Sequence, residues 1–323
     1  MYNNPFNSVW IRLKLFQYRQ VNALFVKLPK PDLGGTKKSK FFFDFSDSKY
    51  THLGDILFYL PLILFLQKKK EFYVAVLTNP DRESFMNFLL RSSGRTVDLY
   101  VIESALDLPC EGVIITSPYK LFDYKSSKLS IVGLGNPHEA IELKYPVYLA
   151  NVFLSNFLDF DDKAELVHDG FEVWRNNFCN SLGNTRGSFK RDLLWVSPFI
   201  ASGKFRDFLG RKKNTIIRFV KQKANADNLD FALIGSALDR SFSFESDDRV
   251  DLRGRNLVEL MILANSDSVK AGVGFDNFWM HFFDIIGKPY FVKFRGRFLK
   301  SQYDLHCQSI NVSFLRSGAR VYI

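Results

Sequence analysis

The chain has 323 residues, 46% of them hydrophobic, which excludes a protein that is disordered throughout and suits two domains better than one. Its formal net charge of +10 gathers at the two ends. Residues 1–40 hold eight basic side chains against one acid, and residues 293–323 hold six against one, so the middle carries a slight negative charge. This distribution disfavours a uniformly basic surface, and we expect no nucleic-acid partner.

The first part of the chain predicts a basic extension followed by one α/β domain. Residues 1–39 interleave apolar and basic side chains, and Pro29, Pro31 and Gly34-Gly35 break any helix there. The expected elements are then a strand at Lys40–Phe45, a helix from Ile56 to about Lys69, a strand at Phe72–Thr78, a helix at Asp81–Ser92, and strands at Val97–Ile102, Val113–Thr116 and Leu129–Val132. Apolar strands that alternate with helices predict a parallel sheet covered on both faces.

A polar stretch over residues 160–190 predicts a linker, and a second alternation follows it. We expect strands at Asp192–Ser197, Phe231–Gly235, Val250–Leu252, Ser268–Gly272 and Pro289–Lys293, with helices at Thr215–Lys223, Leu257–Asn265 and Phe278–Ile286. The pattern predicts an α/β fold with two Rossmann-like domains facing a central cleft, at residues 40–175 and 176–300, and a C-terminal segment at 301–323. In such sheets ligands bind outside the carboxyl ends of the strands.

Cysteine and histidine spacing argues against disulfides and against a structural zinc site. The three cysteines form no CxxC pair and the five histidines form no HxxxH pair, so neither a disulfide framework nor a zinc site is expected. The triplet Asp159-Phe160-Asp161 falls in the polar stretch rather than at a strand end, which argues against a metal site. With no secretory signal, and with a longest apolar run (Ile56–Leu66) too short to span a bilayer, a cytoplasmic protein is expected.

The loop before the first helix holds His52, Gly54 and Asp55. Gly54 permits a tight turn, and Asp55 at the helix start is either a general base for a sugar hydroxyl or a helix N-cap. The pattern by itself favours the cap. His52 has no evident partner in the sequence.

Three loops of the second domain also hold polar residues after strands. Ser202 and Lys204 suit a phosphate site or a solvated turn, and Asp239 suits a ribose hydroxyl or a surface turn. Asp276 and Asn277 are placed to cap the helix that carries His281, which is either a cleft residue or a core histidine.

Taken in chain order, these loops resemble the bacterial heptosyltransferases, glycosyltransferases of the GT-B type that build the lipopolysaccharide core. The segments that carry the resemblance are Gly54-Asp55 with Pro61; Pro198, Ser202 and Lys204; Gly235-Ser236; Asp251-Leu252-Arg253-Gly254; Asp276 to His281; and Gly287-Lys288-Pro289. One departure is Phe278, which stands where the family has glycine.

The resemblance implies an inverting, metal-independent transfer of a sugar from a nucleotide-sugar donor to a lipopolysaccharide core or a related bacterial surface glycan. Asp55 would deprotonate the acceptor, with His52 and Gly54 on the acceptor side. The donor side would comprise Ser202, Lys204, Asp239, Asp276, Asn277 and His281. A GT-B transferase of Kdo or another sugar, and a non-enzymatic α/β binding protein, are the alternatives.

In the GT-B type the C-terminal segment returns to the first domain, so the resemblance implies that residues 301–323 do the same. The two basic ends would then form one face on the acceptor side. Such a face suits contact with the inner-membrane surface, and a solvated basic tail is the alternative.

Overall fold

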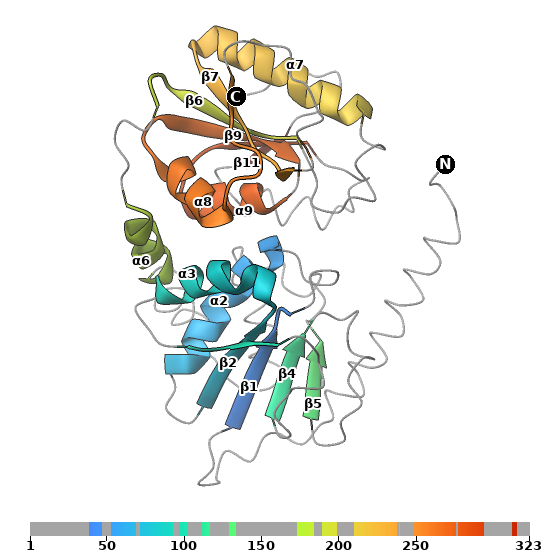
Figure 1. The fold of residues 1–323 in the computed structure, drawn as a ribbon, viewed down its shortest axis with the longest axis vertical. Helices are drawn as coiled ribbons and strands as arrows, with labels where there is room; N and C mark the ends of the chain where they lie inside the picture. Colours follow the sequence, from blue (N-terminus) through green and yellow to red (C-terminus); the bar gives the residue numbers. More distant parts are fainter. Residues whose placement is uncertain are drawn as a thin grey trace, which may run out of the picture. The chain divides into compact units, whose positions relative to one another are not determined.

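The computed structural model describes residues 39–46, 53–68, 72–92, 97–102, 112–116, 129–133, 173–183, 189–198, 210–237, 239, 249–275, 277–293 and 312–314 (Figure 1). Only the backbone is described for residues 39, 55, 58, 59, 61, 62, 65, 112–116, 129–133, 210–213 and 312–314. The chain divides into two compact units: the second begins at Glu172, and it also takes in Leu53–Phe58 and Ser92–Gly94. Each unit is described by itself below.

The first unit holds a five-stranded parallel sheet in the order β3-β2-β1-β4-β5. Its strands are β1 (Ser39–Asp44), β2 (Phe72–Thr78), β3 (Asp98–Val101), β4 (Gly112–Thr116) and β5 (Leu129–Gly133). Its helical segments are η1 (Pro80–Arg82), α3 (Glu83–Arg91) and the part of α2 (Leu53–Lys68) that begins at Tyr59. Phe41, Phe42 and Phe43 are consecutive and all buried, so both faces of β1 are covered. This is the burial expected of a central parallel strand.

Polar side chains tie together the segments that follow β1 and β2. Asp44 is buried at the end of β1 and accepts hydrogen bonds from the Ser46 backbone N–H and hydroxyl. Asn79 donates through Nδ2 to the Ser46 carbonyl (2.6 Å), and Arg82 donates through Nη1 to the Phe45 carbonyl (3.1 Å). The carboxyl edge of the first sheet is thereby held in one arrangement.

The second unit holds a six-stranded parallel sheet in the order β11-β10-β9-β6-β7-β8. The strands are β6 (Leu193–Ser197), β7 (Asp230–Leu233), β8 (Arg249–Asp251), β9 (Val269–Phe275), β10 (Tyr290–Lys293) and β11 (Val312–Phe314). With β6 counted as the first strand, the sheet has the 3-2-1-4-5-6 order of dinucleotide-binding Rossmann folds, and the order reverses between β6 and β9.

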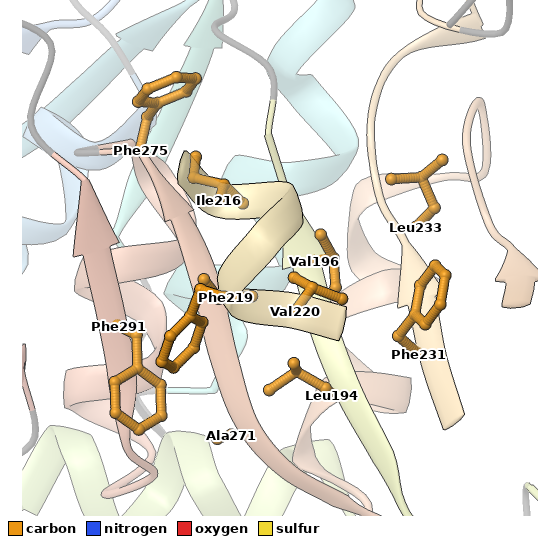
Figure 2. Close-up of a cluster of buried hydrophobic side chains, with 11 residues drawn as sticks. Leu194, Val196, Ile216, Phe219, Val220, Phe231, Leu233, Ala271, Phe275 and Phe291 are labelled. Atoms are coloured by element: carbon orange, nitrogen blue, oxygen red, sulfur yellow. The ribbon is translucent and has the colours of Figure 1, made fainter. Parts of the chain in front are cut away.

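Helices cover both faces of the second sheet. On one face α7 (Gly210–Asp227) places Ile216, Phe219 and Val220 in the main buried cluster (Figure 2). Its other members lie on four strands: Leu194, Val196, Phe231, Leu233, Ala271, Val273, Phe275 and Phe291. On the opposite face Trp195 packs edge-on against Trp279 of α9 (Phe278–Ile285), with ring centroids 5.2 Å apart. Consecutive residues of β6 therefore pack against helices on opposite faces of the sheet.

Each predicted strand and helix is present where the structure describes it, although several ends differ by up to five residues, and part of the predicted linker is a helix. Residues 173–182 form helix α6 (Val173–Leu182), whose Trp174, Phe178 and Leu182 are buried. Phe178 packs edge-on against Phe282 of α9, which explains why the second unit begins at Glu172, four residues before the predicted boundary. The exposed asparagines of this helix made the segment resemble a linker.

The expected return of residues 301–323 to the first domain stays a prediction, because only residues 312–314 of this segment are described. These three form β11, which extends the second sheet and pairs in parallel with β10 from Tyr290↔Val312 to Val292↔Phe314. β11 thereby covers the edge that β10 would otherwise leave unpaired. Both basic ends lie mostly outside the described residues. Among the described helices, none has the length and apolar character needed to cross a bilayer.

Candidate functional site

The carboxyl ends of β6 and β9 form the point where the strand order of the second sheet reverses. β6 ends at Ser197 and β9 at Phe275, and Ser197 is paired with Gly274 across the two strands. From β6 the chain proceeds through α7 to β7, and from β9 it proceeds through α9 to β10, on the other side. Connections that diverge in this way leave a ligand position above the strand ends.

Asn277 joins helix α9 to the end of β6. It is the N-cap of α9, and its Oδ1 accepts a hydrogen bond from the Trp279 backbone N–H (3.0 Å). Its Nδ2 donates to the Ser197 hydroxyl (3.1 Å). The predicted capping role of Asn277 is confirmed. The positive end of the α9 dipole therefore lies at the strand ends, where negative charge on a ligand is favoured.

His281 lies on α9 and faces the first turn of α2. A Cβ atom built on Gly54 would lie 2.7 Å from His281 Cδ2, 3.3 Å from its Nε2 and 3.6 Å from the Cα of Phe278. Gly54 is buried, His281 is half-buried, and both belong to the second unit. The structure thus brings together one residue predicted for the acceptor side and one predicted for the donor side.

Asp55 is the third residue of α2, because this helix begins at Leu53 and not at Ile56 as expected. It therefore lies inside the first helical turn rather than at the N-cap position. A carboxylate in a first turn interacts favourably with the helix dipole. The Asp55 side chain and all of His52, Ser202, Lys204 and Asp276 lie outside the described part of the chain.

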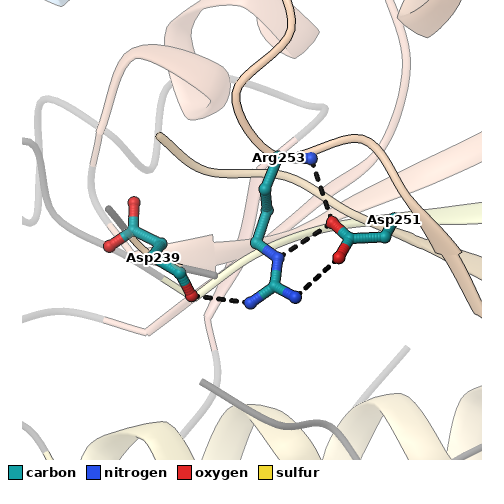
Figure 3. A network of polar contacts seen from close by, with 3 residues as sticks. All are labelled: Asp239, Asp251 and Arg253. Carbon is teal, nitrogen blue, oxygen red and sulfur yellow. Dashed lines mark hydrogen bonds and ion pairs between the residues drawn. The ribbon is translucent and has the colours of Figure 1, made fainter. Parts of the chain in front are cut away.

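Asp239 is buried, and it closes the turn that follows β7. Its Oδ2 accepts hydrogen bonds from the Ser236 backbone N–H and hydroxyl, both at 2.7 Å. Arg253 donates through Nη1 to the Asp239 carbonyl oxygen (2.6 Å; Figure 3). These contacts give Asp239 a structural role in the turn, and a ribose contact stays a proposal.

Arg253 also makes an ion pair with Asp251, as Figure 3 shows. Its Nε and Nη2 donate to the two carboxylate oxygens of Asp251 at 2.8 and 2.6 Å. The side-chain hydrogen bonds from Arg253 lower the pKa of Asp251 from 3.8 to about 2. The side chain of Arg253 is buried and links the segments after β7 and β8, a role that the sequence motif did not reveal.

Lys288, from the Gly-Lys-Pro motif, caps the end of helix α8 (Leu257–Asn265). Its Nζ donates to the carbonyl oxygens of Ala264 (3.0 Å) and Ser266 (2.5 Å). Burial lowers the pKa of Lys288 from 10.5 to about 8. The motif therefore has a structural function at this position. No group of three or more His, Cys, Asp or Glu side chains suited to a metal ion occurs among the described residues.

Known structures with a similar fold were found, although no protein-family model and no curated protein matches the chain. A family 9 glycosyltransferase from Veillonella parvula aligns with a TM-score of 0.52 and 14% identity, covering 88% of this chain and 90% of its own. The E. coli ADP-heptose lipopolysaccharide heptosyltransferase II aligns with 0.53 and 13%, covering 86% and 90%. E. coli heptosyltransferase WaaC, solved with ADP, aligns with 0.52 and 9%, covering 86% and 93%.

This chain has the GT-B fold. The predicted fold class is confirmed, and the heptosyltransferase resemblance seen in the motifs is confirmed at the level of the fold. Identities of 9–14% establish the fold alone. Within this GT-B fold, Asn277 and Ser197 meet at the carboxyl ends of β6 and β9, in the middle of the second sheet.

Proposed function

We propose that the chain is a glycosyltransferase that moves a sugar from a nucleotide-sugar donor to a lipopolysaccharide core or a related bacterial surface glycan. The observation that carries the proposal is the N-terminus of α9, capped by Asn277 and tied to Ser197 at the point where the strand order reverses. That position suits the phosphates of a nucleotide donor. A similar structure was solved with ADP, and another is named for ADP-heptose.

In the proposed reaction the acceptor hydroxyl oxygen attacks the anomeric carbon from the face opposite the leaving phosphate, with inversion. The new C–O bond forms as the bond to the phosphate oxygen breaks, and Asp55 takes the hydroxyl proton. The departing negative charge is stabilised by Lys204 and by backbone N–H groups at α9, with Ser202 and Asp276 beside them. These groups carry the charge, so the proposal requires no metal ion.

The remaining proposed roles follow from position. His52 and Gly54 precede Asp55 in the chain and are assigned to the acceptor side, and His281 of the donor helix packs against Gly54. Asp239 would meet the donor ribose next to the turn that it closes. Closure around both substrates would exclude water and limit donor hydrolysis.

A second candidate function, transfer of Kdo or another sugar, is favoured by Phe278. This residue opens α9 and stacks on Phe282, with ring centroids 5.9 Å apart. A large side chain at the first helical position hinders the close backbone approach that a diphosphate needs. A CMP-linked donor, which carries a single phosphate, avoids this requirement.

The test is a thermal-shift screen of the full chain against ADP-, UDP-, GDP-, dTDP- and CMP-linked sugars. Ligand at about 100 times its Kd adds roughly 2.7 kcal/mol to the free energy of unfolding, so one nucleotide class should raise the Tm by several degrees. A CMP-sugar that acts alone would select the second candidate. No shift with any donor would contradict transferase function and favour the non-enzymatic binding protein.

The Lys204→Ala variant should bind the same donor about tenfold or more weakly, because a charge-assisted hydrogen bond to phosphate is lost. Isothermal calorimetry measures the Kd. Lys221→Ala, on an exposed position of α7, is the matched control and should bind like the wild type. An unchanged Kd for Lys204→Ala would remove this residue from the phosphate site.

We further propose that the basic ends contact the anionic inner-membrane surface near the acceptor. Replacing Trp10 with Ala and Arg12 and Lys14 with Gln should weaken binding to phosphatidylglycerol vesicles about tenfold or more, since each cation contributes roughly 1 kcal/mol. Co-sedimentation at low salt measures the binding. A control with Arg218→Gln and Lys221→Gln loses the same charge from exposed positions of α7. Equal losses in both variants would indicate non-specific charge attraction and contradict the proposal.

A further inference from the structure

The side chain of Tyr290, a residue of β10, packs across the neighbouring strand β9. Tyr290 begins β10 and is fully buried. A Cβ atom on Gly272, its partner in β9, would overlap the Tyr290 ring, and a Cβ atom on Gly274 would overlap the Ser197 carbonyl oxygen and lie 2.5 Å from the Tyr290 hydroxyl. The ring therefore extends along β9 from Gly272 towards Gly274, in the direction of the carboxyl end.

The two glycines are costly at this position. Glycine in a strand interior loses more conformational entropy on folding than other residues and contributes no side chain to the core. Gly272 and Gly274 share the face of β9 opposite Ala271, Val273 and Phe275, which pack in the α7 cluster. A phenylalanine at position 290 would fill the same space, so packing alone does not account for the hydroxyl.

The hydroxyl of Tyr290 reaches the start of α9. It lies 3.2 Å from the Phe275 carbonyl oxygen and 3.5 Å from Asn277 Oδ1, and it donates towards these two acceptors. Asn277 Oδ1 also accepts from the Trp279 N–H, while Nδ2 donates to the Ser197 hydroxyl. The amide of Asn277 is thus bonded on both its oxygen and its nitrogen, which fixes its orientation.

We propose that Tyr290 is a positioning residue that acts through Asn277 to hold the first turn of α9 in place for the donor phosphates. The proposal rests on the proposed function, because only a ligand at α9 gives this fixed geometry a purpose. It assigns to Tyr290 a part in binding that neither the sequence motifs nor the fold indicated.

The decisive variant is Tyr290→Phe, which keeps the ring between the strands and removes the hydroxyl. Hydrogen exchange of the Trp279 backbone amide should be about fivefold faster than in the wild type, the effect of one lost hydrogen bond. NMR of the full-length chain measures this rate. Tyr73→Phe is the matched control, since it removes a hydroxyl bonded to Asp98 and Tyr100 in the first unit. An unchanged Trp279 rate in Tyr290→Phe would overturn the proposal.

A second measurement separates positioning from simple stabilisation. The Kd for the donor nucleotide, starting with ADP as the probe, should rise about fivefold in Tyr290→Phe and stay unchanged in Tyr73→Phe. In an Asn277→Ala background the Tyr290→Phe change should have a smaller effect, because only the bond to the Phe275 carbonyl oxygen remains to be lost. Additive losses would overturn this link.

The two proposals can fail separately. If the wild type binds none of the nucleotides in the screen, the proposed function fails, while the Trp279 exchange rate still decides whether Tyr290 holds the helix start. If the wild type binds and Tyr290→Phe binds equally well, the function survives and the role of Tyr290 in binding is refuted.

Discussion

Replacing Asp55 with Asn is expected to lower kcat for sugar transfer by about 10²–10⁴-fold, which is the usual contribution of a general base. The donor Kd should change little, since the base contacts the acceptor. The Tm should fall only slightly, because a first-turn carboxylate contributes roughly 0.3–1 kcal/mol through the helix dipole. Release of the nucleotide in steady state gives kcat, and calorimetry gives the Kd.

The Asn variant also separates the two roles considered for Asp55. Asparagine keeps the size of aspartate and loses only the weak interaction of its charge with the helix dipole, so a purely structural role predicts nearly full activity in Asp55→Asn. Asp81→Asn, at an exposed position of η1, is a control that also removes one carboxylate. Normal turnover by Asp55→Asn would exclude Asp55 as the base.

Replacing Gly54 with Ala is expected to destabilise the protein by about 1–3 kcal/mol and to lower kcat by about 10²-fold. Alanine is the better helix former by roughly 1 kcal/mol, so propensity alone predicts the opposite sign. The added Cβ, however, would lie 2.7 Å from His281 Cδ2. We expect this overpacking to destabilise the protein by more than the higher helix propensity of alanine stabilises it. Because Asp55 is the next residue, a displaced turn would misplace the base, and an error of 1 Å can cost two orders of magnitude.

A double-mutant cycle tests this contact. Removing the ring with His281→Ala should restore much of the stability of the Gly54→Ala variant, because the overlapping atoms are gone. Thermal unfolding of the wild type, both single variants and the double variant provides the coupling energy. If Gly54→Ala is equally harmful in both backgrounds, the two residues do not interact as described.

Local patterns in the sequence were sufficient to predict most of the elements. Phe72–Thr78 and Leu257–Asn265 have the predicted bounds, because apolar runs and capping residues such as Asn256 act over a few positions. Helix α6 was missed because its exposed side is polar, and only its contact with Phe282 shows that it belongs to the core. β11 was missed because a three-residue strand depends on the edge that it joins.

In the candidate site, too, local features could be predicted from the sequence and long-range contacts could not. Asn277 was predicted as a cap from its place before an apolar helix, since capping is local. The approach of Gly54 to His281, and that of Tyr290 to Gly274, join residues far apart in the chain. A glycine that directly precedes an acid at a helix start was one available signal of close approach. Nothing in the sequence around Asp239 indicated that its carboxylate is bonded within its own turn.

The packing of Tyr290 across β9 limits which substitutions the sequence can accept during evolution. Positions 272 and 290 share one volume, so an aromatic ring at 290 admits only glycine at 272, whereas Gly274 is also required by the backbone carbonyl of Ser197, which a Cβ atom at 274 would overlap. In descendants of this chain positions 272 and 290 should therefore change together: a small residue at 290 would be accompanied by a larger residue at 272, while 274 stays glycine. Such joint replacement would keep the strand packed but would remove the hydroxyl that anchors the start of α9. The constraint on which ligands that end of the sheet can accept would then be lost as well.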